Sequence, residues 1–372
     1  MTRLPILLWH LGRRGGGPRY TLELARALAA RPDVALSLAL SRQSELFDRT
    51  AALDVPLLAV RTYSGPTGFL AGFARLPAIA QSLRTFVERH RIGVAVCGMA
   101  HLWNSWLVPA LKKGGAANVL VVHDALPHAG DNHLVRAAMI RRDIRQADLV
   151  VALSDSVRQQ LIDQHGLTSD RVIASAMGPF RYAGAAPRQA SSLGKAPYRL
   201  LFFGRLLPYK GLDQLLEAAR LLDRQGIEVT LRVVGQGPLA LPDPPPNVRI
   251  ERRWVAEEEI PGLFAETDLV VLPYQEASQS GVLPIAQHLG VPSVVTPVGG
   301  LLEQVAFGRT GFVAADTSAA ALAATIAAIL LNGESYDRMV STLVAADGDV
   351  CWAGIADSFV AALRSRRRPD PA

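Results

Sequence analysis

Residues 200–211 read Leu-Leu-Phe-Phe-Gly-Arg-Leu-Leu-Pro-Tyr-Lys-Gly, and this stretch decides the fold that we expect for the chain. Its first four residues form a short apolar run, which is typical of a strand buried on both faces. Gly204 ends the run, Arg205 and Lys210 follow, and apolar residues with helical spacing then occupy 212–222. A strand, a loop and a helix in this order place two cations at the carboxyl edge of a sheet, where open α/β sheets bind ligands.

Arg205 and Lys210 suit a diphosphate ligand. A guanidinium offers a planar fork of donors, and an ammonium offers a mobile point charge. The simpler alternative is that both are solvated loop charges, and the spacing by itself does not decide between the two.

The basic strand end resembles the donor-diphosphate motif of the family 4 glycosyltransferases, which are retaining enzymes with the GT-B fold. The residues that carry the resemblance are Gly204-Arg205 and Lys210-Gly211, and further pieces of the family pattern recur in order over about residues 5–363. The recurrence favours the functional interpretation of the two cations.

The resemblance implies an α/β fold of the GT-B type, with two Rossmann-like, doubly wound parallel-sheet domains facing a central cleft. We expect an acceptor-side domain at residues 1–182, completed by a C-terminal helix at 352–372. We expect a nucleotide-sugar-binding domain at residues 183–351, after a linker rich in Gly, Pro and Ala at 178–198.

The composition fits a globular chain of two or three domains. The chain has 372 residues, of which 49% are hydrophobic and 19% are charged. No apolar run reaches the roughly 18 residues that span a bilayer, and no secretory cleavage site follows the N-terminus. The two cysteines, Cys97 and Cys351, imply neither a disulfide framework nor a cysteine metal site. These features predict a cytoplasmic protein.

Charge is distributed unevenly along the chain. Residues 1–182 hold 22 Lys and Arg against 13 Asp and Glu, a net charge of +9, whereas residues 183–348 hold 13 against 17, a net charge of −4. A basic half favours an anionic partner. We predict a lipid-linked acceptor or the anionic inner face of the cell membrane rather than nucleic acid, because no nucleic-acid motif or aromatic-and-basic platform occurs. A basic amphipathic helix at 134–147 is either a solvated face or a membrane-facing one.

In the first half, strand-like and helix-like segments alternate, as in a doubly wound parallel sheet. A loop at 11–17 ends in three glycines before a helix expected to begin at Pro18, and the amides of Gly16 and Gly17 could hold a phosphate. Flexible loops also contain such triplets. Family 4 enzymes have a glycine-rich loop here, near the donor phosphate and the acceptor.

His123 directly follows the strand-like run 119–122. A lone histidine there is either structural or functional, and the resemblance assigns it to the donor sugar and the reacting region. A metal site formed by His123, His128, Asp131 and His133 is a weaker alternative, because nothing in the pattern fixes those side chains together. Residues 63–76 contain glycines, prolines and aromatics without periodicity, which we interpret as a mobile loop and part of an acceptor surface.

The second half contains further positions that resemble the family's donor site. The strand-like run 231–234 ends at Gly235, which we interpret as part of a tight turn near the nucleotide. After a shorter run at 248–250, the resemblance places the nucleobase on the backbone near Val255. Trp254 either stacks on that base or packs against the protein.

Residues 275–286 form the second informative stretch. The family pattern is a glutamate, seven residues and a second glutamate. Glu276 matches the first, which in the family meets the hydroxyls of the transferred sugar. The second, which holds the ribose hydroxyls, falls on Pro284, so this sequence departs from the pattern, and Gln279 and Gln287 are the nearest replacements. Backbone amides before a helix expected at 285–289 could cradle a phosphate, and the donor-binding positions there are Gln279, Ser280, Gly281 and Val282.

Together these features predict a retaining hexosyltransferase that needs neither a metal nor a cofactor. Its donor would be a nucleoside-diphosphate sugar and its acceptor a saccharide or a lipid, in polysaccharide or glycolipid assembly. Arg205 and Lys210 would neutralise the leaving diphosphate, while Glu276 and His123 would hold the sugar.

Three rival functions remain open from the sequence. A GT-A transferase would need an early Asp-x-Asp, and Asp347-Gly348-Asp349 matches only the letters, near the end of the chain. A GT-B epimerase or phosphorylase would run a different reaction on similar parts. A non-catalytic partner that binds nucleotide sugars would have lost the second glutamate.

Overall fold

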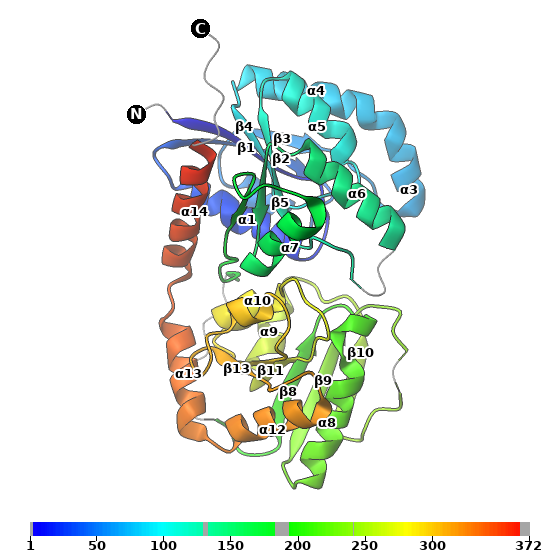
Figure 1. The fold of residues 1–372 in the computed structure, drawn as a ribbon, viewed down its shortest axis with the longest axis vertical. Helices are drawn as coiled ribbons and strands as arrows, with labels where there is room; N and C mark the ends of the chain where they lie inside the picture. Colours follow the sequence, from blue (N-terminus) through cyan, green and yellow to red (C-terminus); the bar gives the residue numbers. More distant parts are fainter. Residues whose placement is uncertain (1–2, 129–132, 183–192, 241, 365–372) are drawn as a thin grey trace. The chain divides into compact units, whose positions relative to one another are not determined.

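The computed structural model describes residues 3–128, 133–182, 193–240 and 242–364 (Figure 1). The chain divides into two compact units, and each is described by itself. The first unit comprises Met1–Leu126, Leu134–Gly178 and Asp349–Ala372, and the second comprises Pro127–His133 and Pro179–Gly348. Each unit is built around one parallel sheet with helices.

The first unit has a seven-stranded sheet in the order β3-β2-β1-β4-β5-β6-β7. Its strands are β1 (Leu4–His10), β2 (Val34–Ser41), β3 (Leu57–Val60), β4 (Val94–Cys97), β5 (Ala117–Val122), β6 (Leu149–Ala152) and β7 (Val172–Ala174). Its helices are α1 (Gly16–Ala29), α2 (Phe47–Ala51), α3 (Gly65–Gly72), the 3-10 turn η1 (Phe73–Arg75), α4 (Leu76–Arg89), α5 (Asn104–Lys113), α6 (His133–Gln146), α7 (Asp155–His165) and α14 (Gly348–Arg364).

The second unit has a six-stranded sheet in the order β10-β9-β8-β11-β12-β13. Its strands are β8 (Tyr198–Phe203), β9 (Val229–Gly235), β10 (Val248–Arg252), β11 (Leu269–Leu272), β12 (Ser293–Val295) and β13 (Gly311–Val313). Its helices are the 3-10 turn η2 (Pro208–Lys210), α8 (Leu212–Arg224), α9 (Ile260–Ala265), α10 (Val282–His288), α11 (Leu301–Gln304), α12 (Ala319–Leu330) and α13 (Gly333–Ala345).

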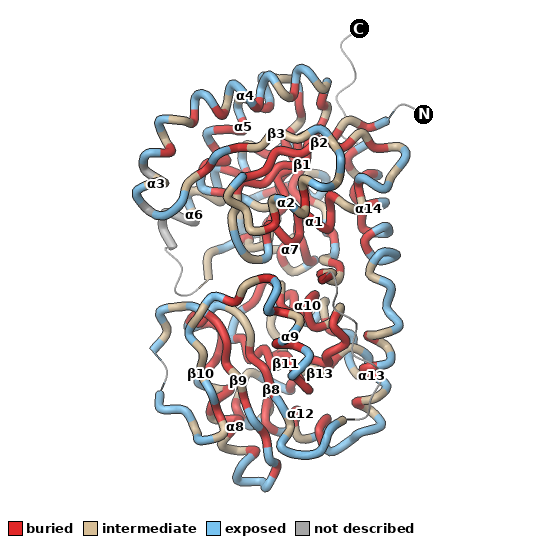
Figure 2. Tube along the Cα trace, turned by 180° about the vertical axis from the view of Figure 1, so that it is seen from behind, coloured by how far each residue is buried: buried red, intermediate tan, exposed pale blue. Residues whose placement is uncertain are grey.

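Burial explains why the short apolar runs become central strands. All four residues of β11 are buried, as expected for a strand covered on both faces. Helix α8 buries the apolar positions of its 3.6-residue period, including Leu212, Leu215 and Leu222, as its spacing predicts. In Figure 2 the two sheets are mainly buried, and the exposed residues lie on the outer faces of helices such as α4 and α8.

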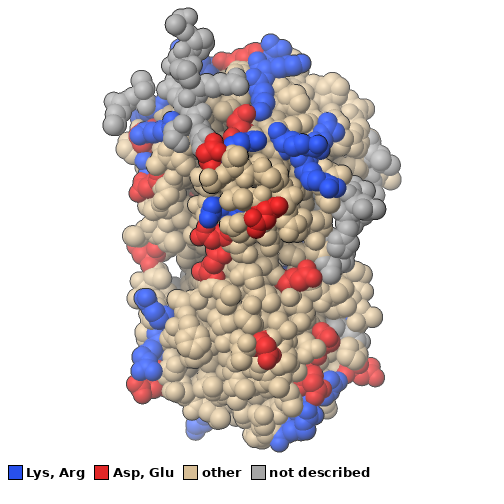
Figure 3. All heavy atoms as spheres, in the orientation of Figure 1, with Lys and Arg blue, Asp and Glu red and all other residues tan. Residues whose placement is uncertain are grey.

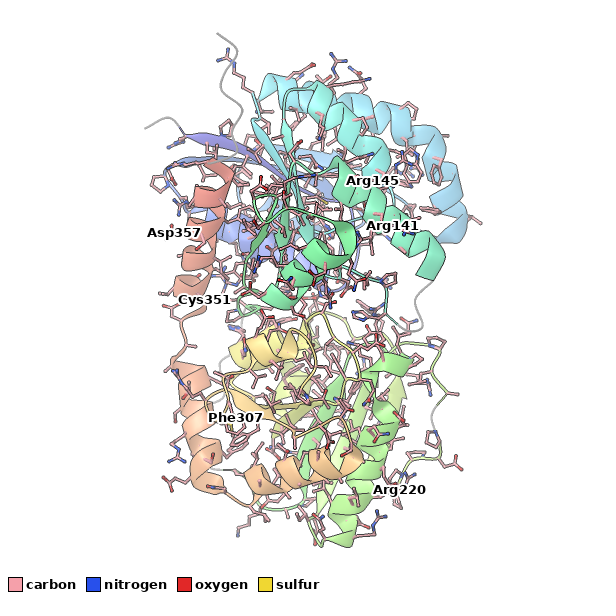
Figure 4. All side chains as sticks on the ribbon, in the orientation of Figure 1. Arg141, Arg145, Arg220, Phe307, Cys351 and Asp357 are labelled. Atoms are coloured by element: carbon pink, nitrogen blue, oxygen red, sulfur yellow. The ribbon has the colours of Figure 1, made fainter. Side chains whose placement is uncertain are left out.

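Helix α14 belongs to the first unit although it follows the second in the chain. Trp352 and Phe359 are each 1% exposed, and the Trp352 ring meets that of Tyr20 edge-on at 5.8 Å between centroids. At the helix surface, Arg31 forms an ion pair with Asp357, and Arg364 lies 2.7 Å from Asp33. Figure 4 labels Asp357 and Cys351 on this helix.

The expected loop at residues 63–76 is wrong, because α3 and η1 occupy it and α4 begins at Leu76. Its aromatic side chains pack together: the rings of Tyr63 and Phe73 lie 5.2 Å and 6.3 Å from that of Trp103. Gly72 allows this packing, because a Cβ there would lie 2.3 Å from a Trp103 ring atom. Tertiary packing thus overrides the weak helical signal of a glycine-rich segment.

Several helix boundaries also differ from expectation. Helix α1 begins at Gly16 rather than Pro18, and α10 begins at Val282 rather than at 285. Helix α9 begins at Ile260, with a proline in its first turn. The Asp347-Gly348-Asp349 triplet lies where α14 begins. Part of the expected linker, residues 183–192, and Asp131 of the alternative metal set lie outside the described residues.

Over the described residues, no helix taken singly has the length and apolarity to cross a bilayer; α12 and α13 meet that test only as a pair bent by 87°. Basic side chains cluster over α6 in Figure 3, where Figure 4 labels Arg141 and Arg145. Both side chains are exposed.

Candidate active site

β8 and β11 are the two parallel central strands of the second sheet, and the strands that follow each of them in the chain are added on opposite sides of the pair. β9 and β10 extend the sheet beyond β8, whereas β12 and β13 extend it beyond β11. Such a topological switch point is where doubly wound sheets bind ligands at the carboxyl ends of their strands. The loop after β8 contains residues 204–210 and the loop after β11 contains residues 273–281, so the two informative stretches of the sequence meet at one edge.

Two glycines let these loops approach the neighbouring backbone. A Cβ on Gly235 would lie 1.7 Å from the carbonyl oxygen of Gly204, and a Cβ on Gly211 would lie 1.9 Å from that of Pro273. Gly204 and Gly211 also have φ values of 137° and 63°, which favour glycine. The loops after β8 and β11 are therefore fixed against each other before any ligand is considered.

Lys210 is held between two aromatic rings. It is 9% exposed, and its Nζ lies 3.5 Å from the ring centroid of Tyr274 and 4.7 Å from that of Tyr209. An ammonium over an aromatic face is attracted by the ring quadrupole. Burial raises the pKa of Tyr274, so its hydroxyl stays neutral beneath the cation. The alternative of a solvated loop charge is wrong for Lys210.

Arg205 is exposed, and Tyr209 orients it. Its Nη2 donates a hydrogen bond to the Tyr209 hydroxyl at 3.0 Å. The same tyrosine therefore contacts both cations, which places a guanidinium and an ammonium on one short loop.

Glu276 lies beside His128 in the second unit. The Glu276 side chain is 60% exposed, and its Oε2 lies 3.6 Å from His128 Nδ1. His128 Nε2 lies 3.2 Å from Ser278 Oγ, and its ring stacks on Tyr209 at 4.6 Å between centroids. His128 thus contacts both the loop after β8 and the loop after β11. The sequence analysis considered His128 only as a possible metal ligand and did not predict these contacts.

A glutamine clamps the segment expected to hold phosphate. Ser280 donates its N–H to Gln304 Oε1 at 2.7 Å, and Gln304 Nε2 donates to the Ser280 carbonyl at 3.0 Å. Val282 N–H donates to Ser280 Oγ at 3.2 Å. Because the amides of Ser280 and Val282 already have acceptors, a phosphate at this segment would have to displace them.

The departure at Pro284 leaves Gln279 as the better placed of the two replacement candidates. Gln287 Nε2 donates to the Gln304 carbonyl at 2.7 Å, so that amide is engaged. Gln279 is 4% exposed, and neither atom of its amide has a hydrogen-bond partner within the described parts of the chain. Pro284 is buried, and its carbonyl accepts the N–H of Phe180 at 3.0 Å.

At the far edge of the same sheet, Val255 follows β10 and is 5% exposed, whereas the neighbouring Trp254 is 42% exposed. The Gly235 carbonyl accepts the N–H of Arg253 at 2.9 Å, which ties the ends of β9 and β10 together.

The remaining site predictions fall in the first unit, again at carboxyl ends of strands. Gly16 and Gly17 form the first turn of α1, and Gly15 before them has a φ of 84° and donates its N–H to Glu45 Oε1 at 2.7 Å. His123 follows β5, and its Nδ1 lies 3.0 Å from Asp124 Oδ1, which orients the ring.

The structure therefore gathers Gly204, Arg205, Lys210, Gly235, Val255, Glu276, Gln279, Ser280, Gly281 and Val282 in the second unit, and Gly16, Gly17 and His123 in the first. It adds Tyr209, Tyr274, His128 and Gln304. Pro273-Tyr274 directly follows a buried run, which is a sequence signal for a strand-end residue, but nothing in the sequence singles out Gln304. Among the described residues, no three His, Cys, Asp or Glu side chains are grouped to hold a metal ion.

Two doubly wound parallel sheets in one chain, the second with a basic switch point, define the GT-B class of glycosyltransferase fold. Residues 197–332 match the family model described as glycosyl transferases group 1, and residues 14–174 match the model described as glycosyltransferase family 4. The chain belongs to glycosyltransferase family 4.

Two curated relatives are similar to this chain over different lengths. The glycogen synthase of Mycobacterium tuberculosis is 28% identical over 242 residues, which cover 61% of this chain and 58% of the relative. The D-inositol 3-phosphate glycosyltransferase of Geodermatophilus obscurus is 28% identical over 402 residues, which cover 90% of this chain and 85% of the relative.

Solved structures share the fold at low identity. HepE from Anabaena in complex with UDP-glucose superposes with a TM-score of 0.70 at 18% identity, covering 96% of this chain and 99% of HepE. A putative UDP-N-acetylglucosamine 2-epimerase from Listeria monocytogenes superposes with a TM-score of 0.59 at 13% identity, covering both chains fully. The fold alone therefore does not separate a transferase from an epimerase.

Proposed function

We propose that the chain is a retaining glycosyltransferase that moves a hexosyl group from a nucleoside-diphosphate sugar to a saccharide or lipid-linked acceptor, in polysaccharide or glycolipid assembly. The observation that carries the proposal is the pair of cations at the β8–β11 switch point, one of them buried between aromatic rings. The named activities of the two relatives and the UDP-glucose bound to HepE support the donor class.

In this proposal, Arg205 and Lys210 stabilise the charge that grows on the leaving diphosphate as the glycosidic bond breaks. Preorganised cations aimed at developing charge are commonly the largest single catalytic contribution. Tyr209 and Tyr274 hold the cations in place before the donor binds, so little reorganisation is needed. Gly204, Gly235 and the 279–282 segment would line the donor, with Val255 at the base.

Glu276 and His123 are proposed to hold the transferred sugar, with residues 1–182 on the acceptor side and residues 183–351 on the donor side. The Glu276 side chain is 60% exposed, so its carboxylate oxygens can accept hydrogen bonds from sugar hydroxyls. We propose retention by front-face displacement and a reaction without a metal ion, because side chains can supply the positive charge that the diphosphate needs.

The experiment that tests the proposal is a donor and acceptor screen. Release of the nucleoside diphosphate is measured for a panel of nucleotide sugars, with and without saccharide and polyprenyl-phosphate acceptors. The anomeric configuration of the product is then determined by NMR. Transfer with retention supports the proposal. Conversion of the donor sugar without an acceptor would indicate an epimerase, and binding without turnover for every pair would indicate a non-catalytic partner.

A peripheral association with anionic membranes is part of the same proposal, with the protein in the cytoplasm. Its support is the net charge of +9 over residues 1–182 and the exposed arginines of α6, among them Arg141 and Arg145. Basic residues near an anionic surface contribute about 1 kcal/mol each when well placed.

A further inference from the structure

Gln304, the last residue of α11, holds both backbone polar groups of Ser280 in the loop after β11. Its Oε1 accepts the Ser280 N–H at 2.7 Å, and its Nε2 donates to the Ser280 carbonyl oxygen at 3.0 Å. The Gln304 carbonyl accepts the Nε2 group of Gln287 at 2.7 Å, which fixes the backbone from which this side chain extends. We call the two bonds between Gln304 and Ser280 the glutamine clamp.

The side chain of Ser280 connects the glutamine clamp to the aromatic ring that contacts Lys210. Ser280 Oγ lies 3.2 Å from the Tyr274 hydroxyl, and it accepts the N–H of Val282 at 3.2 Å. Both Ser280 and Tyr274 are buried. Because the Lys210 ammonium lies 3.5 Å from the centroid of the Tyr274 ring, a bond that fixes this ring also fixes the surface on which the ammonium rests.

One amide between these bonds stays open. The N–H groups of Ser280 and Val282 are engaged, whereas the N–H of Gly281 has no hydrogen-bond partner within the described residues. Gly281 is partly buried, and a Cβ built on it would have its nearest neighbour, a ring atom of Phe180, at 3.9 Å. A phosphate oxygen can therefore accept a hydrogen bond from Gly281 without breaking any bond of the segment.

We propose that Gln304 is a positioning residue for the leaving diphosphate, an inference that rests on the proposed function. By holding Ser280, it keeps the Gly281 N–H open to the diphosphate and keeps the Tyr274 ring fixed against the Lys210 ammonium. Donors that are fixed before the reaction stabilise developing charge without reorganisation. Ser280 uses both polar atoms of the Gln304 side chain, so the effect of Gln304 on the rate is indirect.

A carboxyl group in place of the amide tests the glutamine clamp through its pH dependence. In Gln304→Glu, a neutral carboxyl has one O–H donor and one acceptor oxygen, so it can replace both bonds to Ser280. The ionised carboxylate only accepts, and it opposes the Ser280 carbonyl. This opposition should raise the carboxyl pKa above its usual value of about 4.3.

The rate of Gln304→Glu relative to wild type should therefore change with pH. With the best donor found in the screen, the ratio of kcat values should be lower by about threefold to tenfold at about pH 8, the loss typical of a hydrogen bond. It should recover as the pH falls to about 5. The KM for the donor should change less than about twofold, because the interaction strengthens in the transition state.

Two further variants separate a positioning role from a structural one. Gln304→Met removes both bonds and should lower kcat at every pH. The matched control is Gln214→Met, because Gln214 Oε1 on α8 also accepts a backbone N–H from another element, that of Ala319 at 3.0 Å. The control should lower Tm and leave kcat unchanged. A lower Tm with wild-type kcat in both Gln304 variants, or a loss in Gln304→Glu that does not depend on pH, would overturn the inference.

A double-mutant cycle tests the route through Tyr274. Tyr274→Phe keeps the ring against Lys210 and removes only the bond to Ser280. If Gln304 acts along this route, combining Tyr274→Phe with Gln304→Met should lower kcat no more than about twofold beyond Gln304→Met alone. Losses that multiply would show that the two residues act independently and would contradict the route.

Amide hydrogen exchange in the wild type needs no variant that might fail to fold. Exchange should be slow at Ser280 and Val282 and faster at Gly281, and saturation with the tightest binder among UDP, GDP and ADP should slow it at Gly281. Unchanged exchange at Gly281 in the saturated protein would overturn the inference and leave the proposed function standing. An absence of nucleotide binding and of turnover in the wild type would overturn the proposed function, and this inference with it.

Discussion

Replacing Lys210 by methionine separates a catalytic role from a structural one. Methionine keeps most of the apolar stem between Tyr209 and Tyr274 and removes only the ammonium, which lies 3.5 Å over the Tyr274 ring. A charge-assisted contact to the diphosphate is worth about 1.5–3 kcal/mol. At 1.4 kcal/mol per factor of ten, kcat/KM should fall by about 10- to 150-fold.

Stability should not fall with activity. The cation–π contact stabilises the folded protein by about 0.5–2 kcal/mol. Burying the ammonium away from water destabilises the folded protein by several kcal/mol. The two effects oppose each other, so the Tm of Lys210→Met should equal or exceed that of the wild type. A structural role predicts the reverse pattern, with a lower Tm and an unchanged rate.

The assay is UDP release from the best donor found in the screen, together with a thermal melt of each variant. Arg220→Met is the matched control, because Arg220 is a cation of the same unit that lies on α8 and pairs with Glu217 at 3.3 Å (Figure 4). It should leave kcat/KM unchanged. Wild-type kcat/KM in Lys210→Met would refute the assignment of this cation to the diphosphate.

Four further outcomes are expected. Burial raises the pKa of Asp143 from 3.8 to about 6 despite the Ser105 hydroxyl that donates to it at 2.5 Å. The folded chain therefore holds this proton more tightly than the unfolded chain, and the contribution of Asp143 to the unfolding free energy falls by about 2 kcal/mol as pH rises from 4 to 6. Urea unfolding should show this fall in the wild type relative to Asp143→Asn, and parallel pH profiles would contradict it. Turnover should survive EDTA, and a complete loss restored by manganese or magnesium would point to a metal-dependent reaction. Because Pro284 has no side-chain acceptor, a 2′-deoxyribose donor should lose less than about tenfold in kcat/KM, or 1.4 kcal/mol; a hundredfold loss would indicate a substitute ribose contact, with Gln279 as the first residue to change. Sedimentation with anionic vesicles should exceed that with neutral ones and weaken with salt, and equal sedimentation at low salt would remove the membrane from the proposal.

The sequence predicted the elements that carry strong, local signals. The runs at 119–122, 200–203 and 231–234 are strands as expected, because continuous apolar segments bounded by loops have few alternatives in a chain of this composition. The helix after Lys210 was predicted from its spacing alone. The segment at 63–76 was not, because its helical form depends on the aromatic packing around Trp103, which comes from the loop after β4.

The same distinction applies to the candidate site. The sequence identifies three residues of the site, Arg205, Lys210 and Glu276. Each lies in a segment that follows a strand-like run and matches a known family pattern. The partners that hold them do not stand out, since Tyr274 meets Lys210 only when β8 and β11 are neighbours. Gln304 lies 24 residues from Ser280 and contacts it across two loops.

The return of α14 to the first unit has a consequence for synthesis on the ribosome. The first unit cannot bury Tyr20 against Trp352 until residues 349–364 have been made. Almost all of the second unit is one continuous segment, Pro179–Gly348. It can close its own core as soon as it emerges. The half of the protein that is translated first is thus expected to finish folding last. Until residues 349–364 are translated, the apolar surface that α14 will cover is exposed and available to a chaperone.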